Sequence, residues 1–366
     1  MTEKMRAVSH PGVYIKDAID ELGISQSEFA YRTGLSIKNV STLVNGESNI
    51  TFEVAIKLAG FFHNSVEGWI NLQTKYNLYC NEETKQQQYK EDWLIAKEFD
   101  REFVSNCINV QIDAKNKEAT IDKLRSCFNV VTLSNLKSPD MFAFCRTSVI
   151  KDINDKTIIM RNAWISLAEQ EAREMACSEF NKELIISNAQ YLRSLTLKGP
   201  EAIGKELKLF LAKCGIKLVI LPFLPGSNLS GVTKWIANEN CVMVAVNDYS
   251  KDADRIWFSI FHELGHAIKN HKRHMTISYS KNNILDEDED EANTFAKNIL
   301  INQKDYELFL AGKDYSLGSI KRFALSQNVA SFIVIGRLQK DGILDWSKYQ
   351  NEKPKYEIPY YRNASC

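Results

Sequence analysis

The chain has 366 residues, a length that suggests two or three domains. Its composition, 44% hydrophobic and 25% charged, is that of an ordinary globular protein and excludes a collagen-like or wholly disordered chain. The 46 basic and 46 acidic residues cancel, which argues against a histone-like protein that coats polyanions. No stretch approaches the ~20 apolar residues of a membrane span, and no signal-peptide pattern opens the chain, so we expect a cytoplasmic protein.

Eight cysteines are spread along the chain, and none lies in a Cys-x-x-Cys pair. In a reducing compartment such cysteines remain thiols, and cysteine is among the most often buried residue types. We therefore expect free and mostly buried thiols.

Helical patterns dominate the first two hundred residues. Apolar residues at helical spacing predict a run of short helices over residues 10–80. Residues 81–116 are polar and charged, with aromatic residues at roughly helical spacing, and predict a helical linker. Residues 117–199 predict a helical adapter that contains an amphipathic helix over residues 164–180.

A small sheet is expected farther along. Residues 216–221 are apolar and β-branched and lie between Gly215 and Pro222, which predicts a buried strand, and residues 242–246 predict a second one. Helices are predicted over 254–270, 284–301 and, as two or more short pieces, 315–345, with a polar loop over 271–283. The expected fold is multidomain and mainly α, with a C-terminal α+β domain.

Residues 25–46 have the parts of a helix-turn-helix. Ser25 and Ser36 can each cap a helix, and Gly34 permits the left-handed residue of the tight turn. A recognition helix reads base edges with the outward residues near its N-terminus. The candidate DNA-contacting residues are Ser36, Ile37, Lys38, Asn39 and Thr42.

The alternative for this segment is a simple pair of helices that binds no DNA. Residues 1–80 contain 7 Lys or Arg and 8 Asp or Glu, a net charge of −1, whereas most DNA-binding domains carry a basic face. We therefore expect DNA binding to be modest and assisted by dimerisation.

The N-terminal region resembles the HigA-type antitoxin branch of the XRE regulators over about residues 8–80. The residues that carry the resemblance are His10-Pro11-Gly12, the helix-turn-helix, Asn45-Gly46, Ile50-Thr51, Ala55, Leu58-Ala59 and the run from Trp69 to Tyr76. The resemblance implies an all-helical, homodimeric domain that binds the operator in its own promoter and, in many members, masks a toxin.

An HExxH motif, residues 262–266, lies in an apolar, helix-compatible run. Four residues span about one helical turn, so His262 and His266 project from one face and can share one Zn²⁺. Glu263, next to the first histidine, can act as general base toward a water on the metal. The alternative is two surface histidines, which the apolar flanks argue against. His271 and His274 follow in the polar loop, where we expect solvated side chains.

Zinc needs a third protein ligand, and an acidic helix follows the motif. On a helix, Glu289, Ala292, Asn293 and Ala296 share one face, so Glu289 can reach the metal and Asn293 can hydrogen-bond a ligand. Glu291 remains the second choice for the third ligand. The other carboxylates of this run suit a solvated helix N-terminus.

Residues from about 200 to 345 resemble the ImmA/IrrE family of metallo-endopeptidases. The matching pieces are Gly215-Ile216, Ser230-Gly231, Trp235, Trp257-Phe258 before the HExxH motif, and Glu-x-x-Ala-Asn-x-Phe-Ala over residues 289–296. The resemblance implies a zincin-like fold, zinc bound by His262, His266 and Glu289, Glu263 as the base, and regulated cleavage of a repressor protein. A Pro that often follows the third-ligand helix is missing after Ile301.

The sequence thus predicts four parts: a helix-turn-helix domain over 1–80, a linker over 81–116, an adapter over 117–199 and a zinc peptidase domain over 200–366. The expected protein is a DNA-binding regulator that cleaves a repressor-like protein in a stress, phage or toxin–antitoxin setting. The alternative is an antitoxin-like autoregulator that binds DNA and a toxin, with a structural or sensory zinc domain. We also hypothesise that the strand at 242–246 is an edge to which a substrate segment adds.

Overall fold

The structure is a computed structural model that describes residues 8–142, 145–146, 154–236, 238–249, 251–269, 275–279 and 287–357. It divides into two compact units, residues 1–91 and 92–366, and each is described by itself. Within the described ranges no helix has both the length and the apolar character that a membrane crossing requires.

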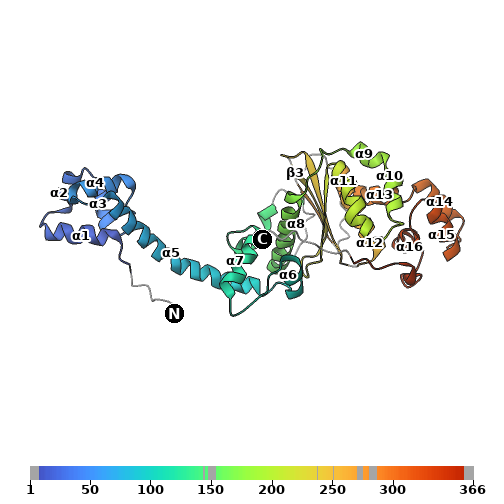
Figure 1. The fold of residues 1–366 in the computed structure, drawn as a ribbon, viewed down its shortest axis with the longest axis horizontal. Coiled ribbons are helices and arrows are strands. Elements are labelled where there is room, and N and C mark those ends of the chain that lie inside the picture. The colour runs from blue at the N-terminus through green and yellow to red at the C-terminus, as the bar shows by residue number, and fades with distance from the viewer. Residues whose placement is uncertain are drawn as a thin grey trace. The chain divides into compact units, whose positions relative to one another are not determined.

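The first unit is built from short helices around one apolar core (Figure 1). Phe29, Val40 and Leu58 are buried at its centre. The helices are α1 (Pro11–Glu21), α2 (Gln26–Thr33), α3 (Ile37–Val44), α4 (Phe52–Phe62) and the start of α5 (Val66–Ala96).

Local signals set the boundaries of α2 and α3. The Ser25 hydroxyl accepts a hydrogen bond from the Glu28 amide, and the Ser36 hydroxyl accepts one from the Asn39 amide, each 3.1 Å long. Such caps satisfy amides that have no partner inside the helix. Gly34 ends α2 in the left-handed conformation, with φ of 68°, which a glycine adopts without steric cost. The helix-turn-helix predicted from these residues is confirmed.

The second unit places helices on both faces of a small sheet (Figure 1). On one side lie α6 (Arg101–Ile108), α7 (Lys117–Phe128) and α8 (Asp155–Glu174). The short helices α9 (Lys182–Ser187), α10 (Ala189–Leu195) and α11 (Lys208–Lys213) precede the central strands. Helices α12 (Ala253–Lys269), α13 (Glu287–Leu300), α14 (Gln303–Ala311), α15 (Leu317–Ser326) and α16 (Ser331–Lys340) follow.

Five strands form a mixed sheet in the order β1-β5-β3-β4-β2. They are β1 (Cys145–Arg146), β2 (Ile216–Leu221), β3 (Leu229–Ile236), β4 (Cys241–Asn247) and β5 (Met275–Tyr279). Strand β4 pairs parallel with β2 and antiparallel with β3, and β3 also pairs antiparallel with β5. The hypothesis that residues 242–246 form an open edge is therefore wrong, since both sides of β4 are already paired.

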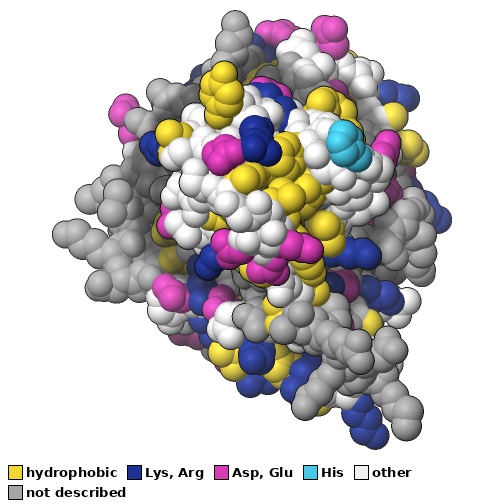
Figure 2. All heavy atoms as spheres, turned by 90° about the vertical axis from the view of Figure 1, so that its left-hand side faces the viewer, with side chains coloured by type: hydrophobic (Ala, Val, Ile, Leu, Met, Phe, Trp, Pro, Cys, Tyr) yellow, Lys and Arg dark blue, Asp and Glu magenta, His cyan; other side chains and the backbone are white. Residues whose placement is uncertain are grey.

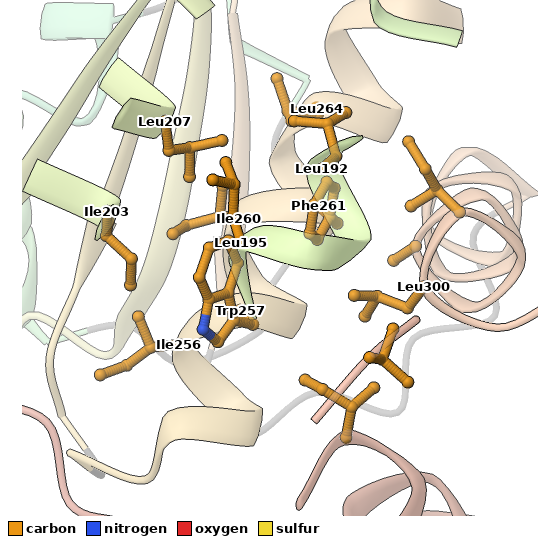
Figure 3. Packing of buried hydrophobic residues seen from close by; sticks show 14 of the residues in the cluster. Leu192, Leu195, Ile203, Leu207, Ile256, Trp257, Ile260, Phe261, Leu264 and Leu300 are labelled. Carbon is orange, nitrogen blue, oxygen red and sulfur yellow. The ribbon is translucent and has the colours of Figure 1, made fainter. Parts of the chain in front are cut away.

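Alternate residues of the central strands enter two different cores. Leu218 and Val244 face α12, where Trp257 and Phe261 pack with residues of α10, α13 and the turn Ile203–Leu207 (Figure 3). Val219, Met243 and Ala245 face the fully buried Trp164 of α8. Burial on both faces explains the nearly continuous apolar sequence of β2 and β4.

The prediction of a mainly helical chain with an N-terminal helix-turn-helix and a C-terminal α+β part is confirmed, but four elements differ in detail. Helix α8 ends at Glu174 rather than at residue 180, and residues 158–168 are all buried because helices and the sheet cover them on several sides. The sequence predicts none of the strands β1, β3 and β5, and β1 lies in the region 117–199 that was expected to be helical. β5 lies in the supposed polar loop and is held by its pairing with β3, some forty residues away in the sequence.

Candidate metal centre and DNA-binding surface

Helix α12 carries the HExxH motif on its buried side. His262, Glu263 and His266 are 8%, 1% and 1% exposed, respectively. The helix is held by Trp257, Phe261 and Leu264, which fill the core beneath it (Figure 3). The motif therefore belongs to a packed interior, and the alternative of two surface histidines is excluded.

Glu289 of α13 lies against both histidines. The Nε2 atoms of His262 and His266 are 3.1 Å apart. One carboxylate oxygen of Glu289 lies 3.3 Å from Nε2 of His262, and the other lies 3.3 Å from Nε2 of His266. Three potential ligand atoms from two helices thus converge on one point, as metal ligands do.

Neighbouring groups set the protonation of this cluster. Burial, the largest single influence, favours the neutral form of Glu289, but hydrogen bonds and charge from His262 and His266 lower its pKa to about 2. Burial likewise disfavours the charged form of His266, yet the hydrogen bond to Glu289 and the charges of Glu263, Glu289 and Asp288 raise its pKa. Glu289 is consequently ionised at neutral pH, the form in which a carboxylate binds a metal.

The hydrogen bond at Nδ1 of His262 fits the role of a metal ligand. Nδ1 of His262 lies 3.1 Å from Oδ1 of Asn293. An amide oxygen only accepts, so Nδ1 of His262 donates, and Nε2 is the nitrogen that faces His266 and Glu289. Asn293 therefore makes the hydrogen bond to a histidine of the HExxH motif that its place on the helix face predicts. The hydroxyl of Ser278 on β5 lies 3.3 Å from Nε2 of His262, a neighbour that the sequence did not reveal because β5 was not predicted.

Glu263 is positioned by β3. The hydroxyl of Thr233 lies 2.7 Å from Oε2 of Glu263 and 3.0 Å from its backbone oxygen. Gly231, on the same strand, leaves room for the carboxylate, because a Cβ there would lie 2.3 Å from Oε1. Sequence reasoning did not single out Thr233, whose role depends on strand pairing.

Small residues bring α12 and α13 together. A Cβ on Gly265 would lie 2.9 Å from Cα of Ala292 and 3.0 Å from its backbone oxygen. Ala292 and Ala296 are fully buried at this contact. The close approach explains how Glu289 reaches both histidines from a separate helix.

Glu291 points elsewhere. Its carboxylate lies 3.5 Å from Nζ of Lys269, and its side chain helps to line a cavity of about 720 Å³. Within the part of the chain that the structure describes, Glu289 rather than Glu291 contacts the histidines. His271 and His274 lie outside the described residues.

The candidate DNA-contacting residues share the N-terminal end of α3. Ser36, Ile37, Lys38 and Asn39 are exposed, and Ile37 is 58% exposed. Thr42 is half-buried, and its hydroxyl accepts a hydrogen bond from Ser48, which leaves it less available to DNA. On the face shown in Figure 2, the coloured basic and acidic side chains are scattered around a strip of hydrophobic ones, and the basic ones do not gather in one patch.

Comparison with known proteins identifies both parts of the chain. Residues 15–69 match the family described as helix-turn-helix, and residues 212–332 match the IrrE N-terminal-like domain. The HTH-type transcriptional regulator YddM of Escherichia coli is 36% identical over 81 residues, which are 22% of this chain and 86% of that protein.

Two further relatives cover the same region. Antitoxin HigA-1 of Vibrio cholerae is 32% identical over 87 residues, 24% of this chain and 82% of that protein. A solved addiction module antidote protein of the HigA family from Coxiella burnetii is 25% identical, with a TM-score of 0.23, and the match covers 24% of this chain and 95% of that one. The chain therefore belongs, through its N-terminal part, to the HigA-like, XRE-type helix-turn-helix regulators, and its C-terminal part is an M78 peptidase-type domain that is IrrE N-terminal-like.

Proposed function

We propose that this protein is a DNA-binding transcriptional regulator with zinc-dependent endopeptidase activity, which cleaves a repressor or another regulator in the cytoplasm. The observation that carries the proposal is the convergence of His262, His266 and Glu289 beside the buried Glu263. This set combines the ligands of a catalytic zinc site with a carboxylate that can accept a proton.

Each residue has a distinct role in the proposed reaction. His262, His266 and Glu289 would hold the ion, which supplies Lewis-acid polarisation of the peptide carbonyl and lowers the pKa of water. Glu263 accepts the proton of the attacking water and passes it to the leaving amine. Thr233, hydrogen-bonded at 2.7 Å, fixes the orientation of the Glu263 carboxylate.

In this proposal, α3 is the helix that binds the operator DNA. Ser36, Ile37, Lys38, Asn39 and Thr42 would face the major groove, with Asn39 able to pair with adenine and Lys38 able to contact guanine or a phosphate. Two copies of the chain would bind as a homodimer, because one unit with a net charge of −1 over residues 1–80 has little nonspecific affinity. The proposed domains are 1–80 for DNA binding, 81–116 as linker, 117–199 as adapter and 200–366 for peptidase activity.

The test compares the purified full-length protein with its Glu263→Gln variant, both loaded with zinc. Glutamine preserves the size of the side chain and an acceptor for Thr233 but cannot take up a proton. We expect both proteins to contain equal zinc and to bind the same promoter DNA, whereas only the wild type generates new N-termini in proteins of the cell that encodes it. Identical sets of N-termini from the two proteins would contradict peptidase function.

A second candidate function is an antitoxin-like autoregulator without proteolysis. It is favoured by the similarity to Antitoxin HigA-1, which extends over 82% of that protein. In this case a small toxin encoded beside the gene should co-purify with the chain. Promoter activity in cells should then be the same for the wild type and Glu263→Gln.

A further inference from the structure

Two cysteines that are 64 positions apart in the sequence meet at one end of the sheet in the second unit. Cys177 lies in the irregular segment after α8, and Cys241 is the first residue of β4. Glu239, in the turn between β3 and β4, completes the group. One sulfur or carboxylate oxygen from each of the three residues lies within 4.8 Å of the others.

The segment that carries Cys177 is fixed in place. The amides of Ser178, Phe180 and Asn181 donate to the backbone oxygens of Ala212, Asn240 and Cys214, at 2.9, 2.8 and 3.0 Å. The ring of Phe180 also packs edge-on against Trp235 of β3, with ring centroids 5.2 Å apart. The position of Cys177 relative to the β3–β4 turn is therefore set by several independent contacts, which is the preorganisation that a ligand set requires.

The charge of this group is suited to a cation with thiolate ligands. Lys217, whose side chain is 2% exposed, lies 2.6 Å from one carboxylate oxygen of Glu239. The same oxygen, Oε2, lies 3.8 Å from Sγ of Cys241. A carboxylate has a second oxygen, so Glu239 can keep the ion pair through one oxygen and bind a metal through the other. Two thiolates, one carboxylate, one ammonium and a divalent cation sum to zero charge, which limits the cost of burying them.

The thiol of Cys241 does not ionise readily without a metal. Burial, with a smaller contribution from the hydrogen bond to Cys177, raises the pKa of Cys241 to about 12. Protonated thiols of this kind react slowly with oxidants. A soft metal ion can instead displace the protons, because thiolate sulfur binds such ions tightly.

We propose that Cys177, Glu239 and Cys241 form a second metal site, separate from the histidine site, for a thiophilic divalent cation such as Zn²⁺. The partly exposed Cys177 and Glu239 leave a fourth position open to water. Binding releases one proton from each cysteine to solvent, forms two metal–sulfur bonds and involves no change of oxidation state. The bound ion would tie the segment after α8 to the turn that precedes β4.

The experiment titrates the reduced full-length protein with Co²⁺ and follows absorption. Only a sulfur ligand gives thiolate-to-cobalt charge-transfer bands, so the histidine site does not contribute to this signal. We expect the bands in the wild type and in Cys80→Ser, an exposed cysteine of the first unit, and their loss in Cys177→Ser and Cys241→Ser. Glu239→Gln should retain the bands but bind the ion about tenfold more weakly.

Alkylation of cysteines provides a measurement that does not depend on the folding of variants. In the wild type, Co²⁺ or Zn²⁺ should slow the alkylation of Cys177, mapped by mass spectrometry, and leave that of Cys80 unchanged. The proposal is overturned if reduced wild type shows no thiolate–cobalt bands, or if the bands persist in both serine variants. A Cys177–Cys241 disulfide in air-exposed protein, together with failure of the reduced protein to bind Co²⁺, would also overturn it and indicate a redox-active dithiol.

Discussion

Gly231 of β3 and Glu263 of α12 are in direct contact, since a Cβ added to Gly231 would lie 2.3 Å from Oε1 of Glu263. Thr233, two residues further along the strand, donates a hydrogen bond to the other carboxylate oxygen of Glu263. Together, the two contacts hold the carboxylate in place. A single strand therefore controls the orientation of the proposed base.

The first prediction concerns this contact. Gly231→Ala should displace the Glu263 carboxylate and slow the Glu263-dependent cleavage about 100-fold, because small misplacements of a catalytic group are costly. Zinc content should remain that of the wild type, since the three atoms nearest to the added Cβ all belong to Glu263 and not to a proposed ligand. Gly204→Ala, where an added Cβ meets nothing within 4 Å, is the control and should cleave normally. Unchanged cleavage by Gly231→Ala would show that the position of Glu263 does not limit the reaction.

The second prediction concerns the contact between α12 and α13. Gly265→Ala would place a methyl group 2.9 Å from Cα of Ala292, so the helices must separate. We expect a loss of about 1–3 kcal/mol in the free energy of unfolding of the metal-free protein, together with weaker zinc binding. Urea unfolding and competition with a chelator measure the two effects. Gly318→Ala on α15, where the nearest atom would be 3.7 Å away, should change neither, and equal effects from both variants would refute the argument.

The sequence predicts those features of the molecule that depend on residues close together in the chain, such as helix ends and the faces of a helix. The hydroxyls of Ser25 and Ser36 and the left-handed Gly34 mark helix ends within a few residues of chain, so the helix-turn-helix followed from the sequence. The HExxH spacing likewise placed His262 and His266 on one helical face. These relationships need no knowledge of the rest of the fold.

Long-range pairing could not be predicted in the same way. The sequence predicts a loop where β5 lies, because its five residues become a strand through pairing with β3 and β1. The order of the strands decides that β4 is not an edge. Thr233 and Ser278 reach the site through that pairing. The meeting of Cys177 with Cys241 also depends on how the segment after α8 returns to the sheet, which no local pattern indicates.

The third prediction distinguishes Glu289 from Glu291 as the third zinc ligand. Glu289→Ala removes the carboxylate that lies 3.3 Å from each histidine, whereas Glu291→Ala removes one that lies beside Lys269. In a Cys177→Ser background, which leaves only the histidine site to be counted, we expect one zinc per chain with Glu291→Ala and none with Glu289→Ala. Elemental analysis after gel filtration gives the answer. Loss of zinc with Glu291→Ala alone would reverse the assignment.

The fourth prediction follows from the fully buried Cys214. Burial raises the pKa of its thiol from 9.0 to about 11. Between these values the unfolded chain loses a proton that the folded chain keeps, so stability is fully present below pH 9 and falls as the pH rises toward 11. A pKa difference of about two corresponds to a loss of about 2–3 kcal/mol in the free energy of unfolding.

Urea unfolding of reduced wild type and Cys214→Ala across this alkaline range tests the effect. The alanine variant should be less stable at neutral pH because it leaves a small cavity, but it should lose less stability as the pH rises. Cys80→Ala, which changes an exposed thiol, should parallel the wild type. Parallel curves for all three proteins would show that Cys214 titrates with an ordinary pKa.

The last prediction separates base reading from phosphate contact on α3. Asn39 and Lys38 are both exposed at the start of the helix, but an amide can pair with adenine, whereas an ammonium acts mainly as a charge. Asn39→Ala should cost about 1–3 kcal/mol on the preferred operator and relax specificity at one base pair. Lys38→Ala should weaken binding to all sequences similarly and reduce the salt dependence by about one counterion. Fluorescence anisotropy on the promoter upstream of the gene, at several salt concentrations, measures both.

Lys75→Ala is the matched control, because Lys75 is an exposed lysine on α5. An equal loss of salt dependence in this variant would mean that Lys38 on α3 makes no specific phosphate contact.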